Sequence, residues 1–131
     1  MISLEQAIEM VMLAFVDMEG GEIYIRKIPS MKVIDVADAI APNAKLNEIG
    51  IRPGEKLHEQ MISEDDSLNT YEYDKYFKIL PDMKDYLDVT KAIKVGKKMA
   101  PRTTYASNTN TEWMTKAELM AWIKENSGDF L

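Results

Sequence analysis

Two segments near the N-terminus carry apolar residues at the spacing of one helical face. The first begins at Ser3, which with Gln6 fits a capping box, and it ends at the glycine pair 20–21. The second covers residues 31–41 and follows Ser30, which is expected to cap it. The apolar positions are Leu4, Ile8, Val11, Met12 and Phe15 in the first segment and Val33, Ile34, Ala37 and Ile40 in the second. Such stripes are typical of helices that turn one face toward a core.

Extended segments alternate with these helices. A β-rich run at residues 22–27 stops at Pro29, and a second short strand is expected at about 45–51. Residues 56–61 then fit a short helix, and the aromatic and charged run at 70–80 alternates like one half-exposed strand. The pattern therefore predicts an order of helix, strand, helix, strand, short helix and strand.

The last third of the chain has a looser composition. From Asp82 onward, basic and small polar residues are frequent, which predicts few packed elements. A final helix at about 115–125 begins with a second capping box, formed by Thr115 and Glu118. Its apolar face consists of Met114, Leu119, Trp122 and Ile123.

This order of elements predicts a small mixed α/β fold. Two or three short strands make a poor sheet by themselves, so we expect a subdomain that normally leans on a larger neighbour. We divide the chain into an α/β subdomain at 1–81 and an extended C-terminal tail at 82–131, whose final helix packs on the same unit.

The charge balance and the residue types narrow the chemistry. The 131 residues carry 16 Lys and Arg against 22 Asp and Glu, which argues against a nucleic-acid partner, because such a partner needs a clustered basic face. The chain has no cysteine and a single histidine, His58, so no thiolate or multi-histidine metal site is expected. No apolar stretch is long enough to span a bilayer and no signal peptide is visible, so we expect a cytoplasmic protein without a membrane partner.

The most informative segment is Gly50-Ile51-Arg52-Pro53-Gly54-Glu55-Lys56-Leu57-His58-Glu59. The planar, permanently charged Arg52 suits a phosphate, and Glu55, three residues later across a rigid turn, suits a ribose diol. The two side chains together therefore suit a nucleotide. The alternative from spacing alone is a surface turn closed by a salt bridge between Arg52 and Glu55.

Two further residues are candidates for ligand binding. Lys27 borders a strand-to-helix crossing, where ligands of open α/β folds tend to lie, and the alternative is a solvated lysine. His58 follows the Arg52 turn and suits a hydrogen bond to a sugar or carboxylate, with a structural role as the alternative. We assign no catalytic residue. Tyr71 and Lys75 form a Tyr-x-x-x-Lys string, which on a helix would place both side chains on one face. In the predicted strand the two side chains would instead lie about 13 Å apart, so we give neither of them a catalytic role.

Several motifs resemble one family in the order in which they occur. They are residues 20–32, residues 49–59, Ser63-Glu64-Asp65-Asp66, residues 69–74 and Thr109-Asn110-Thr111-Glu112-Trp113. Together they resemble the C-terminal part of the inverting UDP-N-acetylglucosamine 4,6-dehydratases. These enzymes are extended short-chain dehydrogenases of bacterial surface-polysaccharide and pseudaminic acid synthesis. The resemblance runs from Leu4 to about Ile123.

The resemblance implies a two-part enzyme, in which an N-terminal Rossmann domain holds NADP and a smaller part closes over the UDP-sugar. This chain resembles the second part, a small mixed α/β substrate-binding subdomain without its Rossmann domain. In the family, the arginine of the matching turn binds the diphosphate and the acid binds the uridine ribose, which carries over to Arg52 and Glu55. The family's reaction moves a hydride from C4 to C6 of the sugar, eliminates water across C5 and C6, and inverts C5.

The chain departs from the complete enzyme in its glycines, because its six glycines form no dinucleotide-binding fingerprint. We therefore expect no cofactor on this chain, NADP in the parent enzyme, and no activity for the chain alone. The Rossmann domain is expected from the same gene or as a separate chain. The alternatives are a stand-alone nucleotide-sugar-binding module and a structural or oligomerisation module. An apolar surface left exposed without the Rossmann domain predicts self-association into homo-oligomers.

Overall fold

The computed structural model describes residues 2–82 and 88–126. The chain divides into two compact units, each of which is described by itself. The sheet unit consists of Ile2–Ile28 and Gln60–Tyr105, and the loop unit consists of Pro29–Glu59 and the described part of Ala106–Leu131. The chain therefore passes between the units three times along its length.

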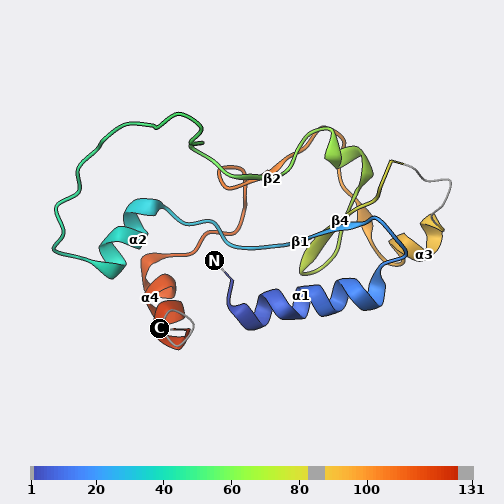
Figure 1. Ribbon diagram of the computed structural model, residues 1–131, viewed down its shortest axis with the longest axis horizontal. Coiled ribbons are helices and arrows are strands. Elements are labelled where there is room, and N and C mark those ends of the chain that lie inside the picture. Colours follow the sequence, from blue (N-terminus) through green and yellow to red (C-terminus); the bar gives the residue numbers. More distant parts are fainter. Residues whose placement is uncertain (1, 83–87, 127–131) are drawn as a thin grey trace. The chain divides into compact units, whose positions relative to one another are not determined.

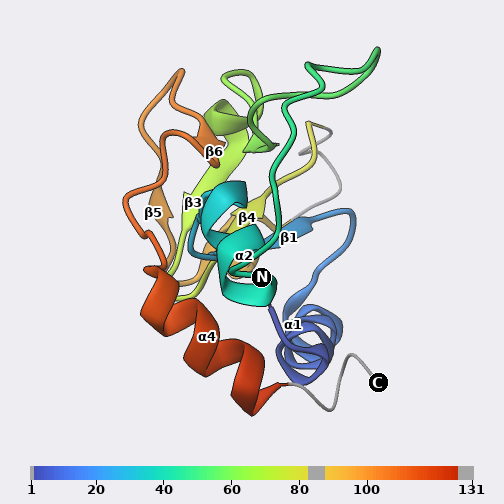
Figure 2. The ribbon, with the colours of Figure 1, turned by 90° about the vertical axis from the view of Figure 1, so that its left-hand side faces the viewer.

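The sheet unit combines helix α1 (Figure 1) with a four-stranded antiparallel sheet of order β1-β4-β3-β5, whose strands are labelled in Figure 2. Strands β3 and β4 form a hairpin, and β1 pairs with the other edge of β4. The short strands β2 and β6 pair with each other separately. The elements are α1 (Leu4–Asp17), β1 (Ile23–Arg26), β2 (Gln60–Ile62), the 3-10 helix η1 (Asp66–Asn69), β3 (Thr70–Glu72), β4 (Tyr76–Ile79), α3 (Val89–Ile93), β5 (Lys97–Lys98) and β6 (Tyr105–Ala106), whose second residue already belongs to the loop unit.

Helix α1 begins where the sequence predicts. The Ser3 hydroxyl accepts a hydrogen bond from the backbone N–H of Gln6, and the Gln6 side chain accepts one from the backbone N–H of Ser3. These reciprocal bonds satisfy two of the backbone donors that every helix start leaves unpaired. The core of the unit lies on the sheet, where the cluster of Ile25, Ile62, Phe77 and Ile79 packs with Met99 and Tyr105.

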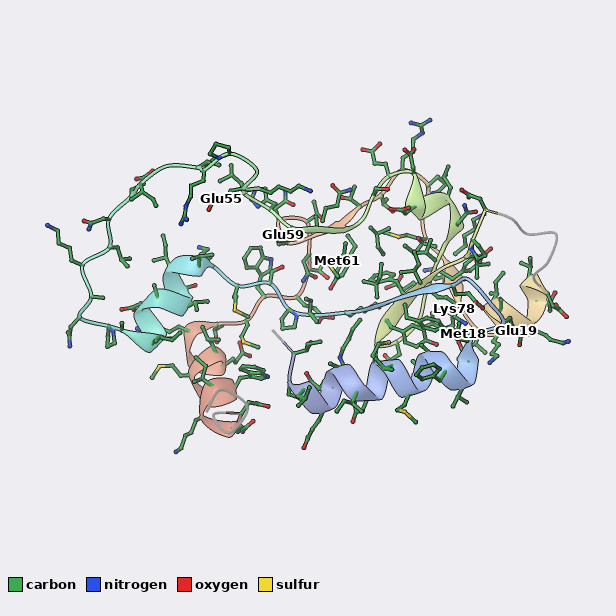
Figure 3. The ribbon with its side chains drawn as sticks, in the orientation of Figure 1. Met18, Glu19, Glu55, Glu59, Met61 and Lys78 are labelled. Carbon is green, nitrogen blue, oxygen red and sulfur yellow. The ribbon has the colours of Figure 1, made fainter. Side chains whose placement is uncertain are left out.

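A fully buried lysine joins the end of α1 to the sheet. The ammonium of Lys78 on β4 (labelled in Figure 3) donates to the Asp17 carboxylate and, over 2.6 Å, to the backbone oxygen of Ala92. The Tyr24 hydroxyl donates to the same carboxylate over 2.9 Å, and Lys94 pairs with it from the solvent side. Burial alone would raise the pKa of Asp17, but the hydrogen bonds from Lys78, Lys94 and Tyr24 outweigh it and lower this pKa to about 2. Asp17 is therefore ionised at neutral pH and holds the buried cation in place.

The loop unit contains two helices, α2 (Val33–Ile40) and α4 (Lys116–Glu125), which contact each other (Figure 2). Leu119 of α4 is fully buried, and Lys116 pairs with Asp38 of α2. As predicted, α4 begins with a capping box between Thr115 and Glu118. Between α2 and β2 the chain runs as a long segment without helix or strand (Figure 1).

Four local predictions are wrong. Residues 45–51 form no strand and 56–59 form no helix; instead the chain becomes a strand at 60–62, where Ile62 is fully buried. The run at 70–80 is a hairpin rather than one strand, closed by the bond from the Tyr73 N–H to the Tyr76 oxygen. Ser30 does not cap α2, which begins after Lys32 without a side-chain cap. Two of these outcomes depend on distant residues, since β2 pairs with β6 and Ser30 bonds with Asn110.

The region after Asp82 contains more packed structure than its composition predicts. Helix α3 carries Ala92, which is fully buried, and β5 extends the main sheet beside β3. The Tyr73 hydroxyl donates to the backbone oxygen of Ile93 over 2.6 Å and holds α3 against the hairpin. The expectation of few packed elements is therefore wrong for residues 88–106.

Candidate functional site

The candidate site is a turn in the loop unit, at residues 50–59. The N–H of Glu55 donates to the backbone oxygen of Arg52 over 3.0 Å and closes the turn. Pro53 fixes the second position, and Gly54 at the third has φ of +88°, which matches a type II turn and requires glycine. The predicted turn is therefore confirmed, and its sequence explains its shape.

The turn directs Arg52 and Glu55 toward each other. The Arg52 Nε lies 3.2 Å from one Glu55 carboxylate oxygen, and the Arg52 backbone N–H donates to the other over 2.9 Å. The two side chains are 72% and 48% exposed, so their mutual attraction contributes at most about 1 kcal/mol in water. The salt bridge that spacing alone suggests is present, and both groups remain accessible to a ligand that offers stronger partners.

An open pocket lies against this turn. It is lined by Gly50, Ile51, Gly54, Glu55, Lys56, Leu57 and Glu59. Lys56 adds a second cation to the site, which sequence reasoning did not single out, because a lysine beside a turn has no distinctive spacing. Glu55 and Glu59 both belong to this segment (Figure 3).

The end of the site segment is tied to a remote part of the loop unit. The Ser107 N–H donates to the Glu59 backbone oxygen over 2.8 Å, and the Glu59 N–H donates to the Ser107 hydroxyl over 3.0 Å. The two residues are 48 positions apart in the sequence, so no local pattern could predict the contact. These bonds fix where the turn segment ends and leave the turn itself exposed.

The candidate residues belong to two different units. His58 is exposed within the site segment, three positions after Glu55. Lys27 belongs to the sheet unit, where its ammonium lies 2.7 Å from Glu72 and 5.1 Å from the centre of the Phe77 ring. A ligand role for Lys27 stays a prediction, and a ligand would share the Lys27 ammonium with Glu72.

Within residues 2–82 and 88–126, no helix combines the length and apolar character needed to cross a bilayer. The same described residues contain no group of three or more His, Asp or Glu side chains placed to hold a metal ion.

Comparison with known proteins defines the class. A profile of the polysaccharide biosynthesis protein family matches residues 1–81, more than half of the chain, and the chain therefore belongs to this family. The inverting UDP-N-acetylglucosamine 4,6-dehydratase of Campylobacter jejuni serotype O:2 is 44% identical over 97% of this chain. This identity confirms the resemblance drawn from the sequence motifs. The match covers 40% of that enzyme, so the chain spans about two fifths of its length.

Two more distant similarities bear on the fold. A UDP-glucose 4-epimerase of Rickettsia canadensis is 27% identical over 91% of the chain, and the match covers 36% of that enzyme. The X-ray structure of Pen from Bacillus thuringiensis superposes with a TM-score of 0.75 and 28% identity, over 95% of this chain and 36% of that one. Together with the observed elements, these similarities confirm the predicted fold class, a small mixed α/β unit of the extended short-chain dehydrogenase type.

Proposed function

We propose that this chain is the UDP-sugar-binding part of a nucleotide-sugar 4,6-dehydratase. The parent enzyme would convert UDP-N-acetylglucosamine to a 4-keto-6-deoxy sugar with inversion at C5, in the cytoplasm, for surface polysaccharide or pseudaminic acid synthesis. The observation that carries the proposal is the 44% identity over 97% of the chain to an inverting dehydratase, with the Arg52-Pro53-Gly54-Glu55 turn exposed.

In this proposal the Arg52 guanidinium binds the diphosphate and Glu55 accepts hydrogen bonds from the ribose hydroxyls. A guanidinium forms paired, charge-assisted hydrogen bonds with a phosphate, and these are stronger than its exposed contact with Glu55. The ligand therefore replaces the Arg52–Glu55 salt bridge without a large cost. With a net charge of −6, the chain must attract the phosphates through cations placed in this segment rather than through an overall basic field.

The residues of this chain do not fit NADP. Its glycines form no glycine-rich fingerprint, and the main sheet is antiparallel, whereas the dinucleotide site of a Rossmann fold follows a parallel strand and opens a helix. We therefore assign NADP and the catalytic residues to the remainder of the parent enzyme and expect the chain alone to be inert. The contribution of this chain is binding energy that positions the sugar.

Titration of UDP into the isotope-labelled chain tests the proposal by NMR. We expect chemical-shift changes centred on residues 50–59, and a tenfold or greater loss of affinity in Arg52→Ala, because hydrogen bonds to charged groups contribute about 1.5–3 kcal/mol. Lys45→Ala, which removes an exposed cation earlier in the same loop, is the matched control and should leave the affinity unchanged. Unchanged spectra at millimolar UDP contradict the proposal and favour a structural or oligomerisation module.

A further inference from the structure

A second pocket, of about 310 Å³, lies in the sheet unit beside the middle of α1. This volume is at the small end of the range for ligand pockets. Helix α1 and strand β1 contact each other on this side of the unit (Figure 1). The pocket shares no residue with the site at 50–59, which belongs to the loop unit. It is lined by Glu9, Met10 and Leu13 of α1, by Arg26 of β1, and by Asp74, Lys75 and Tyr76 at the tip of the β3–β4 hairpin.

The strand register places Arg26 and Tyr76 on the pocket side of the sheet. The two residues are directly opposite each other in the β1–β4 pair, so their side chains share one face. Tyr24 and Lys78 lie two positions further along the same strands, and both side chains donate hydrogen bonds to Asp17 of α1. The face that carries Arg26 and Tyr76 is therefore the face that is turned toward α1.

The walls of the pocket are held in place by contacts within the unit. The Tyr76 ring stacks on the Tyr73 ring, with 4.5 Å between the ring centres. On the other side, the Arg26 Nη1 donates to the Gln6 backbone oxygen over 3.2 Å and ties β1 to α1. A pocket whose walls are already fixed binds a small ligand without a large cost of ordering side chains.

Arg26 has more hydrogen-bond donors than partners. A guanidinium offers five N–H donors, and the Arg26 side chain is only 19% exposed. Within the described residues, its partners are the Gln6 oxygen and the Glu9 carboxylate, which is 3.7 Å away and 71% exposed. No described side chain holds a nitrogen or oxygen that is both buried and unpaired, so the other Arg26 donors reach solvent. A cation that is largely buried and incompletely paired favours an anionic ligand in the pocket.

The other lining residues determine which anion fits. Met10, Leu13 and Tyr76 offer apolar surface, so the ligand needs an apolar group beside its charge. Glu9 and Asp74 repel a second negative charge, which disfavours a phosphate monoester, because it carries between one and two charges at neutral pH. A carboxylate carries one charge and accepts paired hydrogen bonds from a guanidinium. The lining therefore favours a carboxylate attached to an apolar group.

We propose that this pocket binds a small hydrophobic monocarboxylate, a molecule with one carboxylate and one aromatic or branched aliphatic group. Arg26 binds the carboxylate, and Met10, Leu13 and Tyr76 contact the apolar group. The inference concerns the sheet unit alone and does not rest on the proposed function.

Titration of 3-phenylpropionate into the chain, labelled at its methionine and leucine methyl groups, tests the proposal by NMR. We expect saturable shifts of the Met10 and Leu13 methyl signals, with a Kd on the order of 1 mM. The uncharged 3-phenylpropionamide should bind at least tenfold more weakly, because it lacks the charge-assisted bonds. Phenyl phosphate should also bind more weakly, because Glu9 and Asp74 repel its additional charge. Equal binding of the amide, or tighter binding of phenyl phosphate, would overturn the proposal.

Variants of Arg26 test its role directly. Arg26→Gln should weaken the binding of 3-phenylpropionate tenfold or more. Arg26→Lys keeps the charge but loses the paired donors, so its affinity should lie between those of the other two proteins. The matched control Arg102→Gln removes an exposed cation of the same unit outside the pocket and should leave the affinity unchanged. Undiminished binding by Arg26→Gln would refute the assignment.

A second variant covers the case in which Arg26→Gln does not fold. Leu13 is 37% exposed, so Leu13→Glu should fold, and its added carboxylate should weaken binding at least tenfold. Val16→Glu, at a position 84% exposed on the same helix and outside the lining, is its control and should bind as the unmodified chain does. Equal affinities for these two variants, or shifts centred on residues 50–59, would overturn the proposal. The probe and the observed signals do not involve Arg52, so a failure of UDP binding leaves this test intact.

Discussion

Breaking the ion pair between Lys78 and Asp17, which holds α1 to the sheet, should lower the free energy of unfolding by a measurable amount. Lys78 is fully buried and the Asp17 side chain is 12% exposed, so Asp17→Asn leaves a buried ammonium without a countercharge. Removing one partner of a buried pair costs about 3–5 kcal/mol, and we expect the lower end, near 3, because the Asn oxygen still accepts a hydrogen bond. Against a typical total of about 5–15 kcal/mol, this is a large fraction of the stability.

A double variant separates the charge from the packing. In Asp17→Asn/Lys78→Met the cation is gone, and the main remaining penalty is the loss of the Lys78 hydrogen bond to the Ala92 oxygen, about 1–3 kcal/mol, with the Tyr73 hydroxyl still 3.5 Å from that oxygen. The double variant should therefore be more stable than Asp17→Asn alone. Urea unfolding, followed by circular dichroism, measures the free energy of unfolding of the unmodified chain, of Asp17→Asn and of the double variant. The slope of this free energy against urea concentration is expected to be the same for all three proteins.

The control for this experiment is Lys91→Met, which removes an exposed lysine paired with Asp88 and should change stability by less than about 0.5 kcal/mol. A cost below about 1 kcal/mol for Asp17→Asn would refute the reasoning, since Lys78 would then not depend on the carboxylate. A double variant less stable than Asp17→Asn would refute it equally.

Two further predictions concern the stability of the protein at low pH and the packing around Gly96. The pKa of Asp17 falls from 3.8 to about 2 on folding, so its contribution of roughly 2–3 kcal/mol is complete above about pH 4 and is lost as the pH falls toward 2. Between pH 4 and 2.5, the urea concentration at the unfolding midpoint should fall less for Asp17→Asn than for the unmodified chain. An identical fall in both proteins would contradict this. Gly96→Ala would place a Cβ 2.5 Å from the Tyr73 ring, so the free energy of unfolding of this variant should fall by about 1–3 kcal/mol. An unchanged melting temperature would contradict the close contact.

The features that the sequence predicts correctly are determined by nearby residues. Both capping boxes, at Ser3 and at Thr115, involve a partner three positions away. The turn at Arg52 is likewise set by Pro53 and Gly54, and its ion pair spans three residues. The candidate site was therefore visible in the sequence because its central geometry is local.

The features that it misses depend on remote partners. Residues 45–51 have a strand-like composition, but a strand needs a neighbour, and the described structure gives this segment none. Ser30 has the chemistry of a helix cap, yet its hydroxyl accepts a hydrogen bond from Asn110 and its backbone pairs beside Trp113. Contacts across about 80 residues leave no periodic signal, which is why these predictions failed.

Hydrophobic periodicity also does not show which side of a helix contacts the rest of the protein. The stripe of α1 was expected to face a core, but the residues of that stripe are more than half exposed, and the side that contacts the sheet is a second one. A helix that is apolar on both sides is typical of a buried position. The chain is 46% apolar, yet among the described residues only eight apolar side chains are buried. Much of the apolar surface therefore stays exposed, and α1 alone carries six apolar side chains that are more than half exposed.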